Sequence, residues 1–404
     1  MATPFLNLKT LTRFSCYTNS KNGNAIFGIG ITTLLYWIRA QSAVKLTYMA
    51  TILSHSNIEA LSHDLHRLVD NLESAEHGQL IYSALQTIVQ LSQTDTERLD
   101  WKILAGSLQD MHRAIAMFYP HRFNRKVSIF GSARTNVNAP EYKQAFEFAE
   151  KITKQGFMVI TGAGGGIMAA GNEGAGNNSF GLNISLPFEQ SSNGFVLEDA
   201  RLVRFRYFFT RKLYFVKESD AIAIFPGGFG TQDEFFECLT LCQTGRTMPR
   251  PIVLLDKEGG DYWQQWHIFV QDQLIERGLI ANEDCSLYKI TNDVDEACQF
   301  IASFYSVYHS CRWVGDILVV RLRQEITDAH LDRLNDLFGD ILLTGKIERS
   351  QALPMEANEP HITDLPRLIM YFNQHDFGRL YQLIAAINDT CDPSNPMVCH
   401  PEQR

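Results

Sequence analysis

Residues 157–186, which read FMVITGAGGGIMAAGNEGAGNNSFGLNISL, decide the fold. Two short apolar runs, FMVITG (157–162) and FGLNISL (180–186), have the composition of buried β-strands. The glycine-rich segment GIMAAGNEGAG (166–176) lies between them and starts a helix. A strand, a helix and a second strand in this order are typical of a parallel βαβ unit with a right-handed crossover.

The same alternation continues on both sides of this unit. Upstream, a strand at 126–131 precedes an amphipathic helix at 140–156. Downstream, strands at 220–228, 250–256 and 287–293 alternate with helices at 230–245, 261–278 and 294–305. We therefore predict an α/β fold over residues 121–308, a Rossmann-like parallel sheet with helices on both faces. The aromatic-rich stretch at 199–219 fits a core or dimer interface better than a surface that stacks a base.

Two further modules are expected around this domain. Residues 57–120 carry apolar residues at helical spacing, which predicts an N-terminal helical module. Residues 309–404 follow the order βαββα, which predicts a small C-terminal α+β module of ferredoxin-like type. The tail after Pro393 is expected to be loose.

The first residues of the chain differ in composition from the rest. No Asp or Glu precedes Glu59, whereas five Lys and Arg do. The apolar run at 25–38 is too short for a helix to span a bilayer. It could be the core of a signal peptide, part of an organelle transit peptide, or translated sequence upstream of a true start at Met49. We expect residues 1–56 to be a leader or a disordered segment.

Composition narrows the class of protein. The 404 residues include 36 Lys and Arg and 45 Asp and Glu, a net charge of −9, so a nucleic-acid partner is not expected. No membrane span is expected either. The eight cysteines form no CxxC pair, which favours a reduced, cytoplasmic protein. Cys238 and Cys242 are four residues apart, and helix packing explains them better than a metal half-site.

Three loops follow predicted strands, where ligands bind in open α/β sheets. The first, FGSART (130–135), offers a glycine, a serine and Arg134 to an anion, although a plain β-turn explains it equally well. The second, TGAGGGIM (161–168), has neither GxGxxG spacing nor a Walker lysine, so it does not indicate an NAD or ATP site. The third, PGGFGTQDE (226–234), opens a helix, whose free N–H groups attract anions. Glu234 in the first turn of that helix either caps it or faces the ligand.

These motifs together resemble the Lonely Guy (LOG) family. PGGFGTQDE matches the family's PGGxGTxxE signature, and Arg211-Lys212 matches its Arg-Lys pair. GIMAAGNEGA and FGSA are similar to its GIMxAxNxGA helix and first loop, so the resemblance covers about residues 126–305. Residues 162–166 read GAGGG where many members have GGGPG. The flanking modules are absent from short plant-type members and resemble longer bacterial nucleotide nucleosidases in architecture only.

The resemblance implies a phosphoribohydrolase that cleaves nucleoside 5′-monophosphates, including cytokinin riboside 5′-monophosphates or AMP, to a free base and ribose 5-phosphate. It makes Arg211 and Glu234 the catalytic residues. Its substrate-binding positions are Gly131, Ser132, Gly164, Gly165, Gly166, Met168, Lys212, Pro226, Gly227, Gly228, Gly230, Thr231 and Glu237. It implies neither a metal nor another cofactor, and a homo-oligomer of at least two subunits.

The residues leave several alternatives open. A carboxylate near the ribose would stabilise an oxocarbenium-like transition state, the role that fits Glu234. Arg211 would assist departure of the base or hold the substrate, unless it is a structural ion pair. For Glu237, a second active-site carboxylate and a solvated surface residue are equally good interpretations. Asn183 and Glu189 could reach the rim of the binding pocket. A nucleotide-binding sensor or carrier without turnover is the competing function, and the C-terminal module could bind an effector or mediate assembly.

Overall fold

The computed structural model describes residues 77–185, 192–196 and 200–389. The chain divides into two units, residues 1–98 and 99–404, and each is described by itself. In the first unit the described part contains α2 (Gly78–Ser92). The predicted leader, the helical pattern at 57–76, Glu189 and the C-terminal tail lie outside the described residues. The domain boundaries stay a prediction.

A seven-stranded parallel sheet forms the centre of the second unit. Its strands are β1 (Lys126–Phe130), β2 (Met158–Thr161), β3 (Ser179–Ile184), β4 (Leu202–Phe205), β5 (Ala221–Ile224), β6 (Ile252–Leu255) and β7 (Tyr288–Thr291), in the order β4-β3-β2-β1-β5-β6-β7. All residues of β1, β2, β3, β5 and β6 are buried, as expected for a parallel sheet between helices. The predicted fold class is confirmed.

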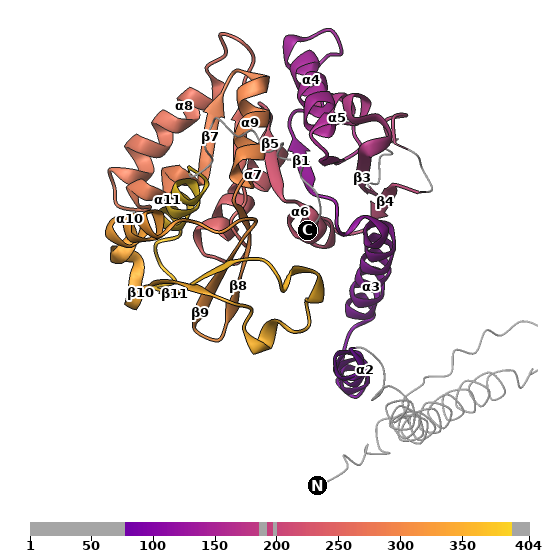
Figure 1. Ribbon diagram of the computed structural model, residues 1–404. Helices are drawn as coiled ribbons and strands as arrows, with labels where there is room; N and C mark the ends of the chain where they lie inside the picture. The colour runs from indigo at the N-terminus through magenta and orange to yellow at the C-terminus, as the bar shows by residue number, and fades with distance from the viewer. Residues whose placement is uncertain (1–76, 186–191, 197–199, 390–404) are drawn as a thin grey trace, which may run out of the picture. The chain divides into compact units, whose positions relative to one another are not determined.

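Helices connect and cover these strands (Figure 1). They are α3 (Arg98–Phe118), α4 (Pro140–Lys154), α5 (Ile167–Ala175), α6 (Phe208–Glu218), α7 (Phe229–Gln243), α8 (Tyr262–Phe269) with a π-helical continuation (Val270–Ile275), and α9 (Val294–Phe304). α4 and α5 pack near β1–β3, α6 packs on β3 and β4, and α9 packs on β6 and β7. Short 3₁₀ segments lie at Tyr119–His121, Gly176–Asn178, Asn282–Leu287, Gly339–Ile341, Pro354–Glu356 and Pro360–Ile362.

A second, antiparallel sheet follows, drawn in orange to yellow in Figure 1. It has the order β10-β11-β9-β8, from β8 (Tyr308–Val314), β9 (Ile317–Leu322), β10 (Leu342–Ser350) and β11 (Arg367–Phe372), with helices α10 (Asp328–Phe338) and α11 (Phe377–Asn388). The order of elements from β9 to α11 is the predicted βαββα. β8 lies beside β9, at the edge where a ferredoxin-like sheet places its last strand.

Two strands escaped prediction for local reasons. β4 is four residues long and merges in sequence with the aromatic stretch that forms α6. β8 contains His309, Ser310 and Arg312, which interrupt its apolar pattern, and it crosses the expected module boundary. Pairing with β3 and β9 respectively, rather than local propensity, makes these segments strands.

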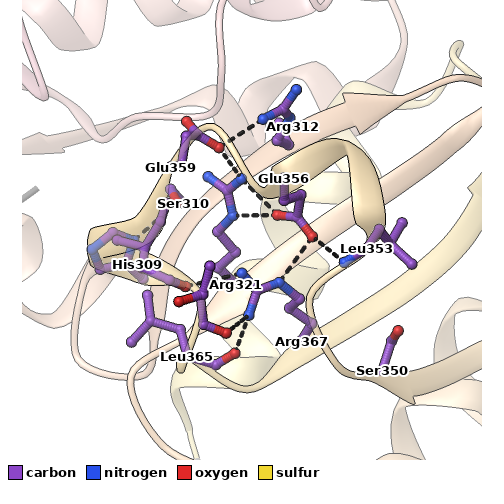
Figure 2. Close-up of polar contacts among 12 residues, drawn as sticks. His309, Ser310, Arg312, Arg321, Ser350, Leu353, Glu356, Glu359, Leu365 and Arg367 are labelled. Atoms are coloured by element: carbon purple, nitrogen blue, oxygen red, sulfur yellow. Dashed lines mark hydrogen bonds and ion pairs between the residues drawn. The ribbon is translucent and has the colours of Figure 1, made fainter.

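The irregular segment between β10 and β11 is held to the second sheet by a buried ionic cluster (Figure 2). Glu356 is fully buried and accepts hydrogen bonds from Arg321 (2.6 and 2.9 Å), Arg367 (3.0 Å) and the Leu353 N–H (3.0 Å). The carboxylate therefore has donors on both of its oxygens, which compensates the cost of burying its charge. The carbonyls of residues 362, 363 and 365 accept from the other nitrogens of Arg367.

Helix α11 attaches the second sheet to the parallel sheet's helices. Phe377 packs on Gly245 at the end of α7, and the Tyr381 hydroxyl bonds both the N–H and the carbonyl of Arg250 at 3.0 Å. Asn388 bonds residues 304, 306, 307 and 308 at the junction between α9 and β8. Buried apolar residues of both sheets form one continuous core.

Candidate active site

The candidate site lies at the carboxyl ends of β1 and β5, where the strand order reverses. A cavity of about 940 Å³ opens there. Its lining residues are Phe130, Gly131, Ser132, Ala133, Arg134, Gly162, Met168, Asn183, Ile184, Phe208, Arg211, Gly227, Gly228, Phe229, Gly230, Thr231, Gln232, Asp233, Glu234 and Tyr262. This place is the one where open α/β sheets bind ligands, and the volume suits a mononucleotide.

The loop after β5 forms one wall of the cavity. Gly228 is the N-cap of α7, and its carbonyl accepts from the N–H groups of Thr231 (3.0 Å) and Gln232 (3.1 Å). Across the described residues, no hydrogen bond involves the N–H groups of Gly228, Phe229 or Gly230. Three free donors at the positive end of a fifteen-residue helix are able to bind an anion.

The loop after β1 packs directly on the loop after β5. The Ser132 N–H donates to the Pro226 carbonyl at 3.1 Å, and the Ser132 carbonyl accepts from the Ile167 N–H at 3.0 Å. A Cβ on Gly227 would lie 2.2 Å from the Thr231 Oγ1, so only glycine lets this hydroxyl approach the loop. The close packing brings the Ser132 and Thr231 hydroxyls to the same cavity.

The glycine-rich loop after β2 supports the site from behind. Ala163 and Gly166 have φ values of 54° and 59°, and a Cβ on Gly166 would lie 2.2 Å from the Ser132 carbonyl oxygen. Gly162 and Met168 line the cavity, whereas Gly164, Gly165 and Gly166 do not. The positive φ of Ala163, a conformation that a side chain rarely adopts, occurs at one of the positions where GAGGG departs from GGGPG.

The two predicted catalytic residues face the same cavity from neighbouring helices. Arg211 on α6 donates its Nε–H to the Leu182 carbonyl of β3 at 2.7 Å. Glu234 on α7 is 9% exposed. Lys212, next to Arg211, reaches α7 and lies 2.7 Å from Glu237, 2.9 Å from Asp233 and 3.8 Å from Glu234. Lys212 therefore joins α6 to three carboxylates of α7.

Burial shifts the pKa values of Glu234 and Arg211. It raises the pKa of Glu234 to about 7, because desolvation outweighs the attraction of Lys212 and Arg211, and Glu237 and Asp233 add repulsion. Burial also lowers the pKa of Arg211, which the Glu234 carboxylate partly opposes. A carboxyl group that titrates near neutrality inside a cavity is typical of catalytic residues.

The structure brings together most of the predicted site residues. Gly131, Ser132, Met168, Arg211, Gly227, Gly228, Gly230, Thr231 and Glu234 line the cavity. Gly164, Gly165, Gly166, Lys212, Pro226 and Glu237 are not among the residues that line it, although Lys212 lies 3.8 Å from Glu234 and the Pro226 carbonyl accepts from the Ser132 N–H. The assignment of these residues to catalysis and substrate binding stays a prediction.

The sequence analysis missed Tyr262, because this residue follows β6, 28 residues beyond Glu234, outside the three loops that the analysis singled out. Asn183 on β3 does line the cavity; its Oδ1 accepts from the Ile184 N–H, and its buried Nδ2 has no partner within the described residues.

Cys238 and Cys242 are both buried on α7. Within the described residues no helix is long and apolar enough to cross a membrane.

Comparison with known proteins finds matches to part of the chain. Residues 165–301 match the family model described as "Possible lysine decarboxylase". The probable cytokinin riboside 5′-monophosphate phosphoribohydrolase LOGL5 of Oryza sativa subsp. japonica is 25% identical over 161 residues, 39% of this chain and 63% of the relative. The probable cytokinin riboside 5′-monophosphate phosphoribohydrolase LOG6 of Arabidopsis thaliana is 24% identical over 160 residues, 39% of this chain and 77% of the relative.

The resemblance to the Lonely Guy family is confirmed. The matched part of this chain spans less than two thirds of LOGL5, so the activity of that relative is not transferred with the resemblance. Among solved structures, a molybdenum cofactor binding protein from Rippkaea orientalis matches at 18% identity and a TM-score of 0.30, over 45% of this chain and 96% of its own. The molybdenum cofactor carrier protein from Chlamydomonas reinhardtii matches at 19% identity and 0.31, over 43% and 94%.

Proposed function

We propose that this LOG-like protein hydrolyses the N-glycosidic bond of nucleoside 5′-monophosphates. The observation that carries the proposal is the position of Glu234. This buried carboxyl group lies one helical turn from three unpaired N–H groups at the start of α7, in one cavity. Such an arrangement holds a phosphate and, a few ångströms further, presents a carboxylate to the attached sugar.

The phosphate is assigned to the start of α7. The N–H groups of Gly228, Phe229 and Gly230 would donate to its oxygens, together with the Thr231 and Ser132 hydroxyls. Arg134 lines the same cavity, is exposed, and forms no ion pair within the described residues, so it is available to a dianion. These donors belong to the protein itself, and the proposed binding mode needs no metal or other cofactor.

The chemistry is assigned to Glu234 and Arg211. As the bond between C1′ and the base nitrogen breaks, positive charge develops on the ribose, and the Glu234 carboxylate stabilises it. Water adds its oxygen to C1′, and its second proton ends on the departing base, which gives a free base and ribose 5-phosphate. Arg211, held by the Leu182 carbonyl, would face the base or the sugar and polarise it for departure.

The proposed assembly is a homo-oligomer formed through α6 and α7. Large apolar side chains on these helices are exposed, namely Phe208, Phe209, Leu213, Phe229 and Phe236. Phe208 and Phe229 line the cavity itself, and Lys212 joins the two helices that carry all five side chains. A second copy of the chain would cover them. Sedimentation of a Leu213→Glu, Phe236→Glu variant should show dissociation into monomers.

The test is release of free base from AMP, GMP, CMP, UMP, IMP and N6-isopentenyl-AMP, with the matching nucleosides as controls. Glu234→Gln should lower kcat about 100-fold or more, whereas Glu258→Gln, at an exposed carboxylate outside the cavity, should leave it unchanged. Cleavage of nucleosides at the rate of the monophosphates would contradict the phosphate assignment. Tight binding of monophosphates without turnover would instead identify a sensor or carrier.

A further inference from the structure

Tyr262 is fixed in the cavity wall by the end of β6. Its backbone N–H donates to the Asp256 carboxylate at 2.8 Å, and Gly260 packs so closely on that carboxylate that a Cβ would lie 2.4 Å from it. The neighbouring Trp263 is fully buried, meets the Tyr262 ring edge-on with centroids 4.8 Å apart, and bonds the Leu255 carbonyl. The Tyr262 side chain therefore has little freedom to move.

The hydroxyl of Tyr262 joins two points of the loop after β5. It donates to the Gly227 carbonyl at 2.7 Å and accepts from the Gln232 Nε2 at 2.8 Å. Gly227 precedes the N-cap of α7, and Gln232 lies in the first turn. The phenol thus connects both sides of the three free N–H groups.

This contact fixes the orientation of one peptide group. A trans peptide is planar, with its carbonyl and N–H on opposite sides. Because the Gly227 carbonyl points to Tyr262, the N–H of Gly228 points the other way. Without the hydroxyl, rotation of this glycine peptide would be inexpensive and would turn a carbonyl dipole toward the bound anion. The two consecutive hydrogen bonds, from Gln232 to Tyr262 and from Tyr262 to Gly227, also polarise and strengthen each other.

We infer that Tyr262 is a positioning residue for the 5′-phosphate, acting through the Gly227–Gly228 peptide. The inference rests on the proposed function, because it assigns the phosphate to the start of α7. The LOG-like site then includes a residue that follows β6 and begins α8. The strand order reverses between β1 and β5, so β6 lies on one side of this point and the glycine-rich loop after β2 lies on the other.

Tyr262→Phe tests the inference, with Tyr288→Phe as its matched control. Tyr288 belongs to the same aromatic cluster, packs on Trp266 and bonds His267 through its hydroxyl at 2.7 Å, but does not line the cavity. Tyr262→Phe should raise KM for AMP about tenfold, with kcat changed less than about twofold. The inhibition constants of inorganic phosphate and ribose 5-phosphate should rise by the same factor, and that of adenine should stay unchanged. Tyr288→Phe should alter none of these constants.

Each outcome separates the inference from the proposed function. Suppose that the wild type hydrolyses AMP. If Tyr262→Phe then leaves KM unchanged, or raises the inhibition constant of adenine as much as that of phosphate, the positioning role is wrong and the proposed function stands. If the wild type hydrolyses no nucleotide, calorimetric binding of AMP and inorganic phosphate to the same variants decides. If Tyr262→Phe binds AMP and inorganic phosphate more weakly and Tyr288→Phe does not, the inference is supported even though the protein is not a hydrolase. Equal affinities, or no binding to the wild type, overturn it.

Discussion

The guanidinium of Arg211 lies directly against Gly162, so close that a Cβ on this glycine would be 2.4 Å from Nη2. The Met168 Sδ would be 2.6 Å from the same Cβ. A residue from the loop after β2 thereby defines where the α6 arginine lies in the cavity. The Leu182 carbonyl accepts a hydrogen bond from the Nε–H of the same guanidinium.

Gly162→Ala should therefore displace Arg211 and lower kcat about tenfold to 100-fold, because small errors in position are costly in catalysis. The measurement is steady-state hydrolysis of AMP together with thermal unfolding. Gly339→Ala is the control, since a Cβ there meets nothing within 4 Å. Wild-type kcat in Gly162→Ala would show that Arg211 has room to adapt or takes no part in the reaction.

Titration of Glu234 should appear in the pH profile of the reaction. The proposed role requires the carboxylate, and burial raises its pKa to about 7, so kcat should rise with pH and level off above that value. Glu237 raises this pKa by repulsion, and Lys212 lowers it. Glu237→Gln should move the inflection to lower pH, and Lys212→Gln should move it to higher pH. An inflection that both variants leave in place belongs to another group.

The same shift predicts how stability depends on pH. The pKa of Glu234 is raised from 4.5 to about 7 in the fold, so between these values the native state binds the proton more tightly than the unfolded chain. Stability is therefore lost as pH rises through this window, by up to about 3 kcal/mol. The Tm of Glu234→Gln should match the wild type near pH 4 and exceed it by several degrees at pH 8. A difference that is constant with pH would contradict the assigned burial.

Within the ionic cluster of Figure 2, the buried Glu356 should matter more for stability than the partly exposed Glu359. Glu356→Ala leaves Arg321 and Arg367 buried without their carboxylate, which should cost about 3–5 kcal/mol. Glu359→Gln, at a partly exposed carboxylate beside Arg312 and Arg321, should cost about 1 kcal/mol or less. Denaturant unfolding measures both. Equal losses would mean that burial does not decide the contribution.

The sequence predicts the parts of the molecule that local chemistry determines. Alternating apolar runs and glycine-rich turns locate the parallel sheet, and the PGGFGTQDE loop locates Glu234, because each signal is contained in one segment. Tyr262 carries no such signal: its role comes from the folding of β6 beside β5, which places its hydroxyl on Gly227. β8 is similar, since the pairing with β9 rather than its own composition makes it a strand.

Asn388 tests whether the C-terminal sheet is a separable module. Its Oδ1 accepts from the N–H groups of Val307 and Tyr308, both at 2.9 Å, and its Nδ2 donates to the Phe304 carbonyl at 2.8 Å. Asn388→Ala leaves these groups unpaired at the junction of the two sheets, at a cost of about 1–3 kcal/mol for each buried group. Because the sheets share one core, we expect a single unfolding transition at a lower Tm, with loss of hydrolysis at the same temperature. Asn388→Asp keeps the acceptor oxygen, so its Tm should fall less than that of Asn388→Ala. Two separate transitions, with hydrolysis surviving the first, would mean that the C-terminal sheet unfolds independently and is free to act as a regulatory module.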